Sequence, residues 1–156
     1  MEPTMEHRPE RIEETIAYRM YRTSRLIRHL HYMTLQQNGF DLSPEQWFIL
    51  NKLHVKSPQT QIELGESLID DRPNMTRLLN AMEKKGWVKR QPDTRDRRKM
   101  QVHVTEEGLA LIEACLPPVK KAREAMRHEL DAADLAAFWR TLDQLDANLG
   151  KRIKQK

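Results

Sequence analysis

The most informative segment of the chain spans residues 72–104 and reads RPNMTRLLNAMEKKGWVKRQPDTRDRRKMQVHV. Four apolar residues in its first part recur at i, i+3, i+4 and i+7, the spacing of one buried stripe on a helix. They are Met75, Leu78, Leu79 and Met82. Gly86 is typical of a helix C-cap, and residues 87–90 and 100–104 have the pattern of two short strands around a polar loop. The segment therefore predicts a helix over 73–85 followed by a β-hairpin.

The excess of positive charge lies in the same segment. Between residues 72 and 99, ten Lys and Arg residues stand against three acidic residues, a net charge of +7. The whole chain of 156 residues carries only +4, so the remainder sums to about −3. A basic helix and hairpin on an otherwise acidic chain are typical of a surface that meets the groove of a polyanion.

Two capping signals upstream predict two more helices. SPEQ at 43–46 has the form of a capping box, and an apolar face of Trp47, Leu50 and Leu53 follows it. TQIE at 60–63 opens a shorter helix, in which we expect three residues to be buried. They are Ile62, Leu64 and Leu68. The order helix, short helix, basic helix, strand, charged loop, strand describes a winged helix-turn-helix, a mainly α fold with a small β-hairpin.

The flanking segments predict long helices. Apolar spacing favours a first helix over about 11–37 and a last helix over about 132–150. Another helix should begin after Thr105, with Pro117 and Pro118 expected to bend or interrupt it. The first and last helices have apolar stripes that a small winged core cannot cover, which favours packing against a second copy of the chain.

The length predicts a single domain over residues 1–156. Within it we expect residues 11–37 and 106–152 to form a helical dimerisation region. Residues 43–105 should form the winged-helix lobe that binds DNA.

The first turn of the basic helix has short polar side chains that suit base edges and phosphates. Arg77 is the best candidate for bidentate contact with guanine, although Asn74 and Thr76 could equally cap the helix. In the hairpin loop, a carboxylate such as Asp96 could hold an arginine extended toward a minor groove, and the alternative is a solvated loop. The predicted DNA-binding residues are Arg72, Asn74, Thr76, Arg77, Lys84, Arg95, Asp96, Arg97, Arg98 and Lys99.

Residues 64–108 resemble the MarR family of transcription regulators. The segment SPEQW at 43–47 is similar to the start of that family's second helix, and DRPNMTRLL at 71–79 to its recognition helix. EKKGWV at 83–88 is similar to the approach to the wing, and DRR at 96–98 with VHVTEEG at 102–108 to the wing and the next helix start.

The resemblance implies a homodimer that often represses nearby genes and leaves its DNA when a small phenolic or anionic ligand binds. A two-fold dimer would bind a pseudopalindromic operator. By this analogy Arg98 enters the minor groove with support from Asp96. The family's ligand pocket would be lined by His29, Tyr32, Met33, Trp47 and Leu50, although residues at this spacing are more often plain core.

Other residues carry weaker hypotheses. Arg19, Arg22, Arg25 and Arg28 recur every three positions and could contact phosphate or line a crevice for an anionic ligand, but a solvated face with ion pairs to the last helix is favoured. His29 and His31 lie too close in sequence to share one helical face, so we predict no metal site. The single cysteine, Cys115, fits a reducing cytoplasm, and an inert buried thiol is favoured over a redox sensor.

Several classes of protein are disfavoured. Residues 1–10 lack the apolar run of a secretory signal, and no stretch approaches the ~20 apolar residues of a membrane span. The chain has no glycine-rich phosphate loop and no nucleophile elbow, so we expect neither a cofactor nor an enzymatic activity. The alternative to a regulator that binds double-stranded DNA is a winged-helix module that docks a partner protein and has little specific DNA binding.

Overall fold

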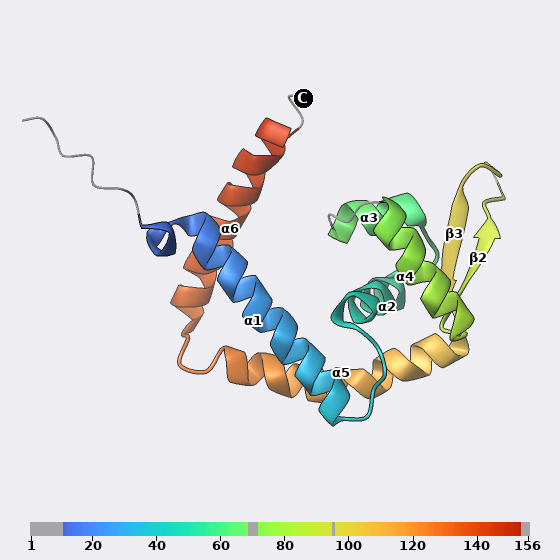
Figure 1. Cartoon of the computed structure of the whole chain (residues 1–156), viewed down its shortest axis with the longest axis horizontal. Coiled ribbons are helices and arrows are strands. Elements are labelled where there is room, and N and C mark those ends of the chain that lie inside the picture. Colours follow the sequence, from blue (N-terminus) through green and yellow to red (C-terminus); the bar gives the residue numbers. More distant parts are fainter. Residues whose placement is uncertain (1–10, 69–71, 95, 154–156) are drawn as a thin grey trace, which may run out of the picture. The chain divides into compact units, whose positions relative to one another are not determined.

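The computed structural model describes residues 11–68, 72–94 and 96–153 (Figure 1). Its helices are the 3-10 turn η1 (Ile12–Glu14) and α1 (Ile16–Gln37), α2 (Pro44–Val55), α3 (Gln61–Leu68), α4 (Arg72–Lys84), α5 (Glu106–Met126) and α6 (Ala132–Ile153). Its strands are β1 (Gln59–Thr60), β2 (Val88–Pro92) and β3 (Met100–Val104). The predicted fold class, mainly helical with a small antiparallel sheet, is confirmed.

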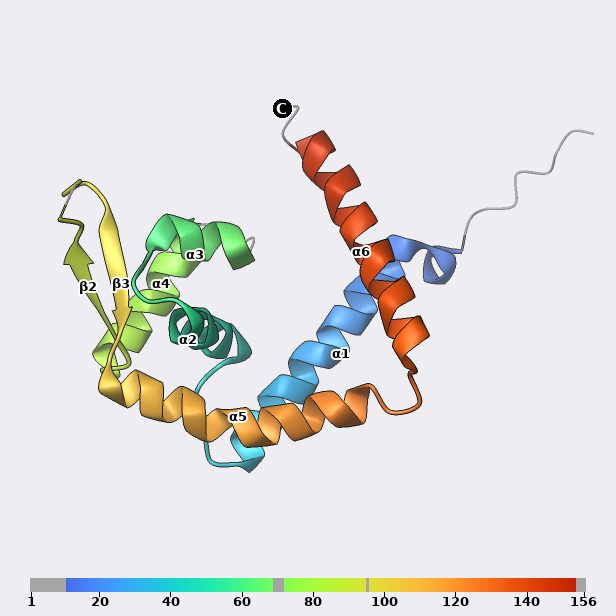
Figure 2. The ribbon, with the colours of Figure 1, turned by 180° about the vertical axis from the view of Figure 1, so that it is seen from behind.

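Contacts divide the chain into two compact units, Met1–Ala122 and Arg123–Lys156. In the first unit, α2, α3 and α4 gather beside the β2–β3 hairpin, as both ribbon views show (Figures 1 and 2). The sheet order is β1-β3-β2 with both pairs antiparallel, and Arg90 lies opposite Val102. This arrangement is a winged helix, with α3 and α4 as the helix-turn-helix and the hairpin as the wing.

One hydrophobic core holds the winged helix together. Each of its elements contributes fully or almost fully buried side chains, and each large aliphatic side chain removed from water stabilises the fold by about 1.5–3 kcal/mol. Those of α2 to α4 are Trp47, Ile49, Leu50, Leu53, Leu64, Met75, Leu78, Leu79 and Met82, and the strands add Val88 and Val102. The predicted apolar stripe of α4 is therefore confirmed.

The predicted caps are present. Ser43 Oγ accepts from the Gln46 amide at 3.2 Å, and Gln46 Oε1 accepts from the Ser43 amide at 2.9 Å, a complete capping box at the start of α2. Thr60 and Glu63 exchange the same pair of bonds before α3. Gly86 ends α4 with φ of +76°, a conformation that glycine adopts without steric cost.

Gly108 explains how closely α5 approaches the wing. Gly108 is buried in the first turn of α5, and a Cβ atom there would overlap the carbonyl oxygen of Trp87. The amide of Thr105 donates to this same carbonyl at 3.1 Å. The absence of a side chain at position 108 therefore lets α5 begin directly against the start of β2.

Two predicted boundaries were wrong. The first helix starts at Ile16 instead of residue 11, because Thr15 accepts from the Tyr18 amide as N-cap and a 3-10 turn precedes it. The first strand of the hairpin extends to Pro92, two residues further than expected, because Asp93 still pairs with Lys99 across the loop. The short strand β1 was not predicted, since two residues carry no periodic signal.

Two further expectations fail, namely the burial of Ile62 and an interruption of the helix at Pro117 and Pro118. Ile62 is 49% exposed because it lies on the outer side of α3, whereas Leu64 is buried and Leu68 is partly buried. Pro117 and Pro118 do not interrupt α5, which is continuous from Glu106 to Met126. Cys115 and Val119, on either side of the prolines, are anchored in the core and hold both parts of this helix in place.

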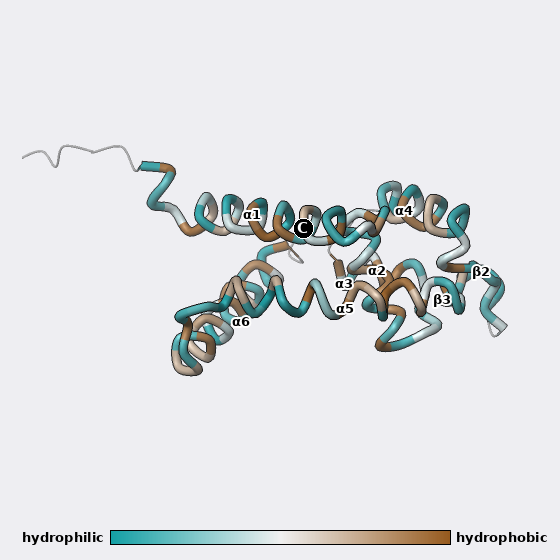
Figure 3. Tube along the Cα trace, turned by 90° about the horizontal axis from the view of Figure 1, so that it is seen from below, coloured by the Kyte–Doolittle hydropathy of each residue, from teal (hydrophilic) through white to brown (hydrophobic). Residues whose placement is uncertain are grey.

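The second unit consists mainly of α6. The amide of Asp134 donates to Asp131 Oδ1 at 2.8 Å and starts this helix. Hydrophobic and hydrophilic residues alternate along it, as they do along α1 (Figure 3), and none of its described residues is buried. None of the described helices combines the length and the hydropathy that a membrane-spanning segment needs.

Candidate nucleic-acid interface

Helix α4 presents one face to the core and the opposite face to solvent. The four apolar residues of its stripe are at most 4% exposed. Because the stripe fixes the rotation of the helix, Arg77 and Lys84 must lie outside it, and both are exposed. Asn74 and Thr76, in the first turn, are partly buried.

The guanidinium of Arg77 is held by its own helix. Arg77 Nη2 donates to Asn74 Oδ1 at 2.6 Å, one turn earlier. A guanidinium has five N–H donors, so this bond orients the planar group and leaves donors for a second partner. The pair that the sequence assigned to base contacts thus forms one connected unit on the exposed face of α4.

Thr76 is committed to contacts within the protein. Its hydroxyl donates to the carbonyl oxygen of Arg72 at 2.9 Å and accepts from Gln61 Nε2 at 2.7 Å. A hydroxyl has one proton and two lone pairs, so Thr76 retains one lone pair and its methyl group for an external partner. Sequence reasoning missed Gln61, which ties α3 to the start of α4 through this contact.

A chain of hydrogen bonds orders the wing loop. The Asp96 amide donates to Asp93 Oδ1 at 3.1 Å, and Gln101 Nε2 donates to Asp93 Oδ2. Asp96 Oδ1 in turn accepts from both the amide and the Nε of Arg98, each at 3.1 Å. The Arg98 side chain is 92% exposed, so its terminal amino groups extend into solvent from a fixed base.

The remaining predicted cations of the wing are Arg97 and Lys99, which are exposed. Arg95 lies outside the described residues. A hollow of about 230 Å³ separates the start of α3 from the wing, and Arg72, Arg98 and Lys99 bring three positive charges to it. The other residues around it are Thr60, Gln61, Ile62 and Met100.

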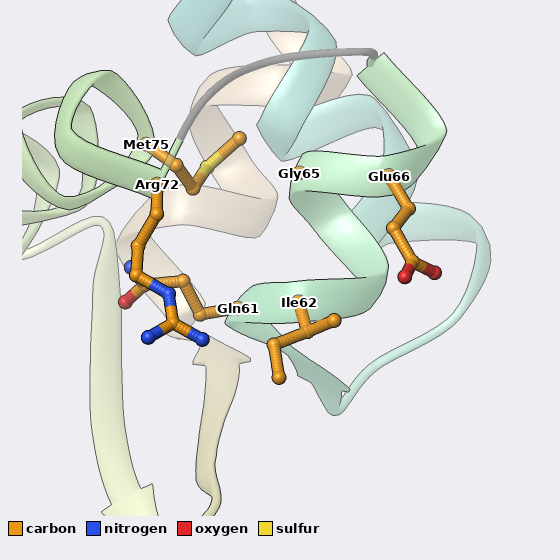
Figure 4. A pocket seen from close by; sticks show the side chains of 6 residues that line it. All are labelled: Gln61, Ile62, Gly65, Glu66, Arg72 and Met75. Carbon is orange, nitrogen blue, oxygen red and sulfur yellow. The ribbon is translucent and has the colours of Figure 1, made fainter. Parts of the chain in front are cut away.

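A smaller hollow of about 150 Å³ adjoins the first, between α3 and α4 (Figure 4). The Arg72 side chain leaves the first turn of α4 and reaches past Gln61, while Met75 and Ile62 supply apolar surface. Both hollows therefore share Arg72, and the larger one places Arg72 of α4 near Arg98 and Lys99 of the wing.

The residues predicted to line a ligand pocket fall into two groups. Trp47 and Leu50 are 1% and 0% exposed and belong to the core. Tyr32 and Met33 are 45% and 36% exposed on α1, and His29 is also exposed. His31 is the histidine of α1 that lies against Trp47, with ring centroids 5.5 Å apart.

The arginine row on α1 is partly explained by an ion pair. Arg28 Nε and Nη2 donate to the two carboxylate oxygens of Glu45 at 2.7 and 3.3 Å, which links α1 to the first turn of α2. Burial raises the pKa of Glu45, but the hydrogen bonds from Arg28, its own backbone and Ser43 outweigh burial and leave the pKa below its usual value. The pair therefore stays charged at neutral pH.

Cys115 is buried, as the sequence favoured. Burial in the core raises the pKa of its thiol to about 11. Among residues 11–68, 72–94 and 96–153, no group of three or more His, Cys, Asp or Glu side chains could hold a metal ion.

Comparison with known proteins agrees with this geometry. The model of the MarR family matches residues 42–100, which include α2, the helix-turn-helix and β2 up to the first residue of β3. Residues 42–100 are therefore similar in sequence to a MarR-family domain. This match contains the exposed face of α4 and the wing loop, while Gln101, which donates to Asp93, lies one residue beyond it.

Solved structures share the fold over nearly the whole chain. BpsR of Bordetella bronchiseptica, whose DNA binding is regulated by 6-hydroxynicotinic acid, has 18% sequence identity and a TM-score of 0.80, covering 89% of this chain and 98% of its own. A mutant of MarR from E. coli complexed with operator DNA has 24% identity and a TM-score of 0.79, covering 88% and 99%. PcaV of Streptomyces coelicolor, in complex with its natural ligand, has 17% identity and a TM-score of 0.76, covering 90% and 97%. The chain therefore has the fold of a MarR-family transcriptional regulator.

Proposed function

We propose that the protein is a homodimeric transcriptional repressor that binds a pseudopalindromic operator and leaves it when a small anionic or phenolic ligand binds. The observation that carries this proposal is the pairing of two ordered arginines. Arg77 is held by Asn74 on the exposed face of α4, and Arg98 is held by Asp96 on the wing. A winged helix that holds one arginine on its recognition helix and one on its wing suits the major and the minor groove of one duplex.

The geometry supports a division of contacts. The first turn of α4 enters the major groove, where Arg77 donates two hydrogen bonds to a guanine edge. Arg98 extends into the minor groove, whose negative potential favours a guanidinium. Arg72 and Lys99 hold backbone phosphates at the hollow between α3 and the wing, and Lys84 and Arg97 add positive charge.

Exposed apolar side chains support the homodimer. Those of α1 include Ile16, Met20, Tyr21 and Leu26, and those of α6 are Phe138, Trp139, Leu149 and Ile153. Apolar surface on this scale is usually covered in an oligomer. A two-fold dimer would place two recognition helices about 34–36 Å apart, one turn of the DNA helix.

The effector is proposed by analogy with the neighbours. The ligand of BpsR is an aromatic carboxylic acid with a hydroxyl group, which fits a phenolic or anionic class. We propose that Tyr32, Met33 and His29 line its site, with Trp47 and Leu50 behind them. The protein acts in this scheme in the cytoplasm and without catalytic turnover.

The test is fluorescence anisotropy with DNA from immediately upstream of the gene, against a shuffled duplex, over a series of salt concentrations. We expect at least a ~10³-fold preference for the upstream DNA. Arg98→Ala should weaken binding and reduce the slope of log affinity against log salt by about one unit.

Lys121→Ala is the matched control, because it removes one exposed positive charge from α5, far along the chain from the wing. We expect it to retain the preference for the upstream duplex. Equal, steeply salt-dependent binding to both duplexes would contradict specific recognition, and absence of binding at low salt would favour a protein partner instead.

A further inference from the structure

Arg90 belongs to the basic segment, but its charge is used inside the protein. Its side chain leaves β2 toward α4 and is 20% exposed. Arg90 Nη2 donates to Glu83 Oε2 at 2.6 Å and to Asn80 Oδ1 at 2.6 Å, and Arg90 Nε donates to Glu83 Oε2 at 3.1 Å. One guanidinium therefore joins two successive turns of the recognition helix to the wing.

The backbone of β2 takes part in the same contact. The carbonyl oxygen of Trp87 accepts from the Thr105 amide, and the Asp93 amide donates to the carbonyl oxygen of Lys99. The backbone N–H and C=O groups of odd-numbered residues in this stretch therefore point toward β3. In an antiparallel pair, the backbone groups of the residues between them point away from the partner strand. Arg90 is one of these, and its outward amide donates to Glu83 Oε1 at 3.0 Å. Both oxygens of Glu83 are thus bound to one residue of the edge strand.

The electrostatics agree with the geometry. The side-chain hydrogen bond from Arg90 lowers the pKa of Glu83, and the bond from the Arg90 amide lowers it further. Glu83 is therefore ionised at neutral pH, and the charge-assisted bonds are of the stronger kind. The contact joins α4, which carries Arg77, to the first strand of the hairpin whose loop carries Arg98.

We propose that Asn80, Glu83 and Arg90 form a brace that sets the position of the wing relative to the recognition helix. Arg90 is a positioning residue, since its guanidinium is bound to Asn80 and Glu83 of α4. With the brace in place, Arg77 and Arg98 approach one duplex at a single spacing. Without it, each arginine still binds DNA, but the two no longer fit the same site together.

The first experiment measures the brace without DNA. Residual dipolar couplings of the backbone amides in α4 and in the β2–β3 hairpin are compared in the native protein, in Arg90→Gln and in Lys89→Gln. Lys89 is exposed on the same strand, so its variant loses the same charge and leaves the brace intact. In the native protein and in Lys89→Gln, we expect a single alignment tensor to fit the couplings of both α4 and the hairpin, as for one rigid body. In Arg90→Gln, we expect the two elements to need different tensors.

Hydrogen exchange gives an independent readout. In Glu83→Ala, we expect the Arg90 amide to exchange about tenfold faster, because it loses its acceptor, while the Gln91 amide changes little. If Arg90→Gln does not fold, Glu83→Gln carries the coupling experiment, since it keeps the shape of the side chain but removes its charge and one of the two oxygens that accept from Arg90. A single alignment tensor in Arg90→Gln, or an unchanged Arg90 amide in Glu83→Ala, would overturn the brace.

The second experiment rests on the proposed function. In Arg90→Gln we expect the preference for upstream over shuffled DNA to fall about tenfold, whereas Lys89→Gln should retain it. The substitution Arg98→Ala should also reduce the affinity for upstream DNA less in the Arg90→Gln protein than in the native protein, because the contributions of Arg90 and Arg98 are coupled. Equal preferences in the two Gln variants would overturn the positioning role.

A failure of the brace and a failure of the proposed function can be distinguished by these two experiments. If no duplex is bound specifically by the native protein, the proposed function is wrong, while the dipolar couplings and the exchange rates still decide whether the brace holds the wing.

Discussion

Arg77 illustrates how a single side chain is prepared for recognition. Asn74 Oδ1 accepts a hydrogen bond from Arg77 Nη2 at 2.6 Å, which limits the rotation of the guanidinium before any DNA binds. Arg77→Ala should weaken the binding free energy for the operator by about 1–3 kcal/mol and relax the preference for the correct base pair at one operator position. Anisotropy with duplexes that differ at single positions measures this. Equal losses on operator and random DNA would show that Arg77 contacts only the backbone.

Cys115 offers the opposite case, a reactive group made inert. A pKa of about 11 means that the neutral thiol dominates at every pH below that value, with on the order of a hundredfold less thiolate near neutrality than at a pKa of 9.0. Iodoacetamide at pH 8 should leave the folded protein unmodified and alkylate Cys115 once guanidinium unfolds it. Mass spectrometry distinguishes the two states, and rapid alkylation of the folded protein would contradict the buried thiol.

Single residues were predictable where their role is local. The caps at Ser43 and Thr60 follow from contacts three residues apart, so the sequence predicts them directly. The commitment of Thr76 to Gln61 spans 15 residues and depends on how α3 meets α4. The same holds for Arg90, which the sequence counts only as one more cation.

At the scale of elements, α4 depends on its buried stripe. Leu79 is completely buried, and Leu79→Ala should lower the free energy of unfolding by about 2–5 kcal/mol through lost burial and a cavity. Lys84→Ala, on the exposed face of the same helix, should change it by less than about 0.5 kcal/mol. Urea denaturation followed by circular dichroism measures both. Similar values for the two variants would mean that α4 does not pack as described.

Elements with a clear period and clear caps were predicted, and those shaped by tertiary contact were not. Helices α2 and α4 follow from spacing, whereas β1 exists only because β3 lies beside it. Prolines normally break a helix, but α5 continues through Pro117 and Pro118 because core residues flank them. The exposure of Ile62 likewise reflects which side of the short helix α3 meets the core.

For the whole molecule, the exposed apolar side chains of α6 predict self-association. We expect sedimentation equilibrium to show a dimer, and Leu149→Asp to shift it toward a monomer by placing a charge in the apolar interface. Val55→Asp is the control, because Val55 is also highly exposed but lies at the end of α2. A monomeric native protein, or equal effects of both substitutions, would contradict dimerisation through α6.

The proposed surface for DNA follows from the sequence at this scale because charge is a sum over residues. A net +7 between residues 72 and 99 indicates a polyanion partner whichever individual contacts the side chains make. A ligand site depends instead on which side chains meet in space. The predicted set on α1 and α2 includes His29, yet His31 is the residue that contacts Trp47.

The outward amide of Arg90 has a consequence for the behaviour of the protein at high concentration. A protruding hairpin exposes the edge of a sheet, and an open edge recruits strands from other molecules and promotes aggregation. On β2 the Arg90 amide is already bound by Glu83, and Pro92 has no amide to offer. The wing thus extends from the molecule with part of its edge closed to strand addition, which lowers the tendency of this edge to pair with strands of other copies of the chain.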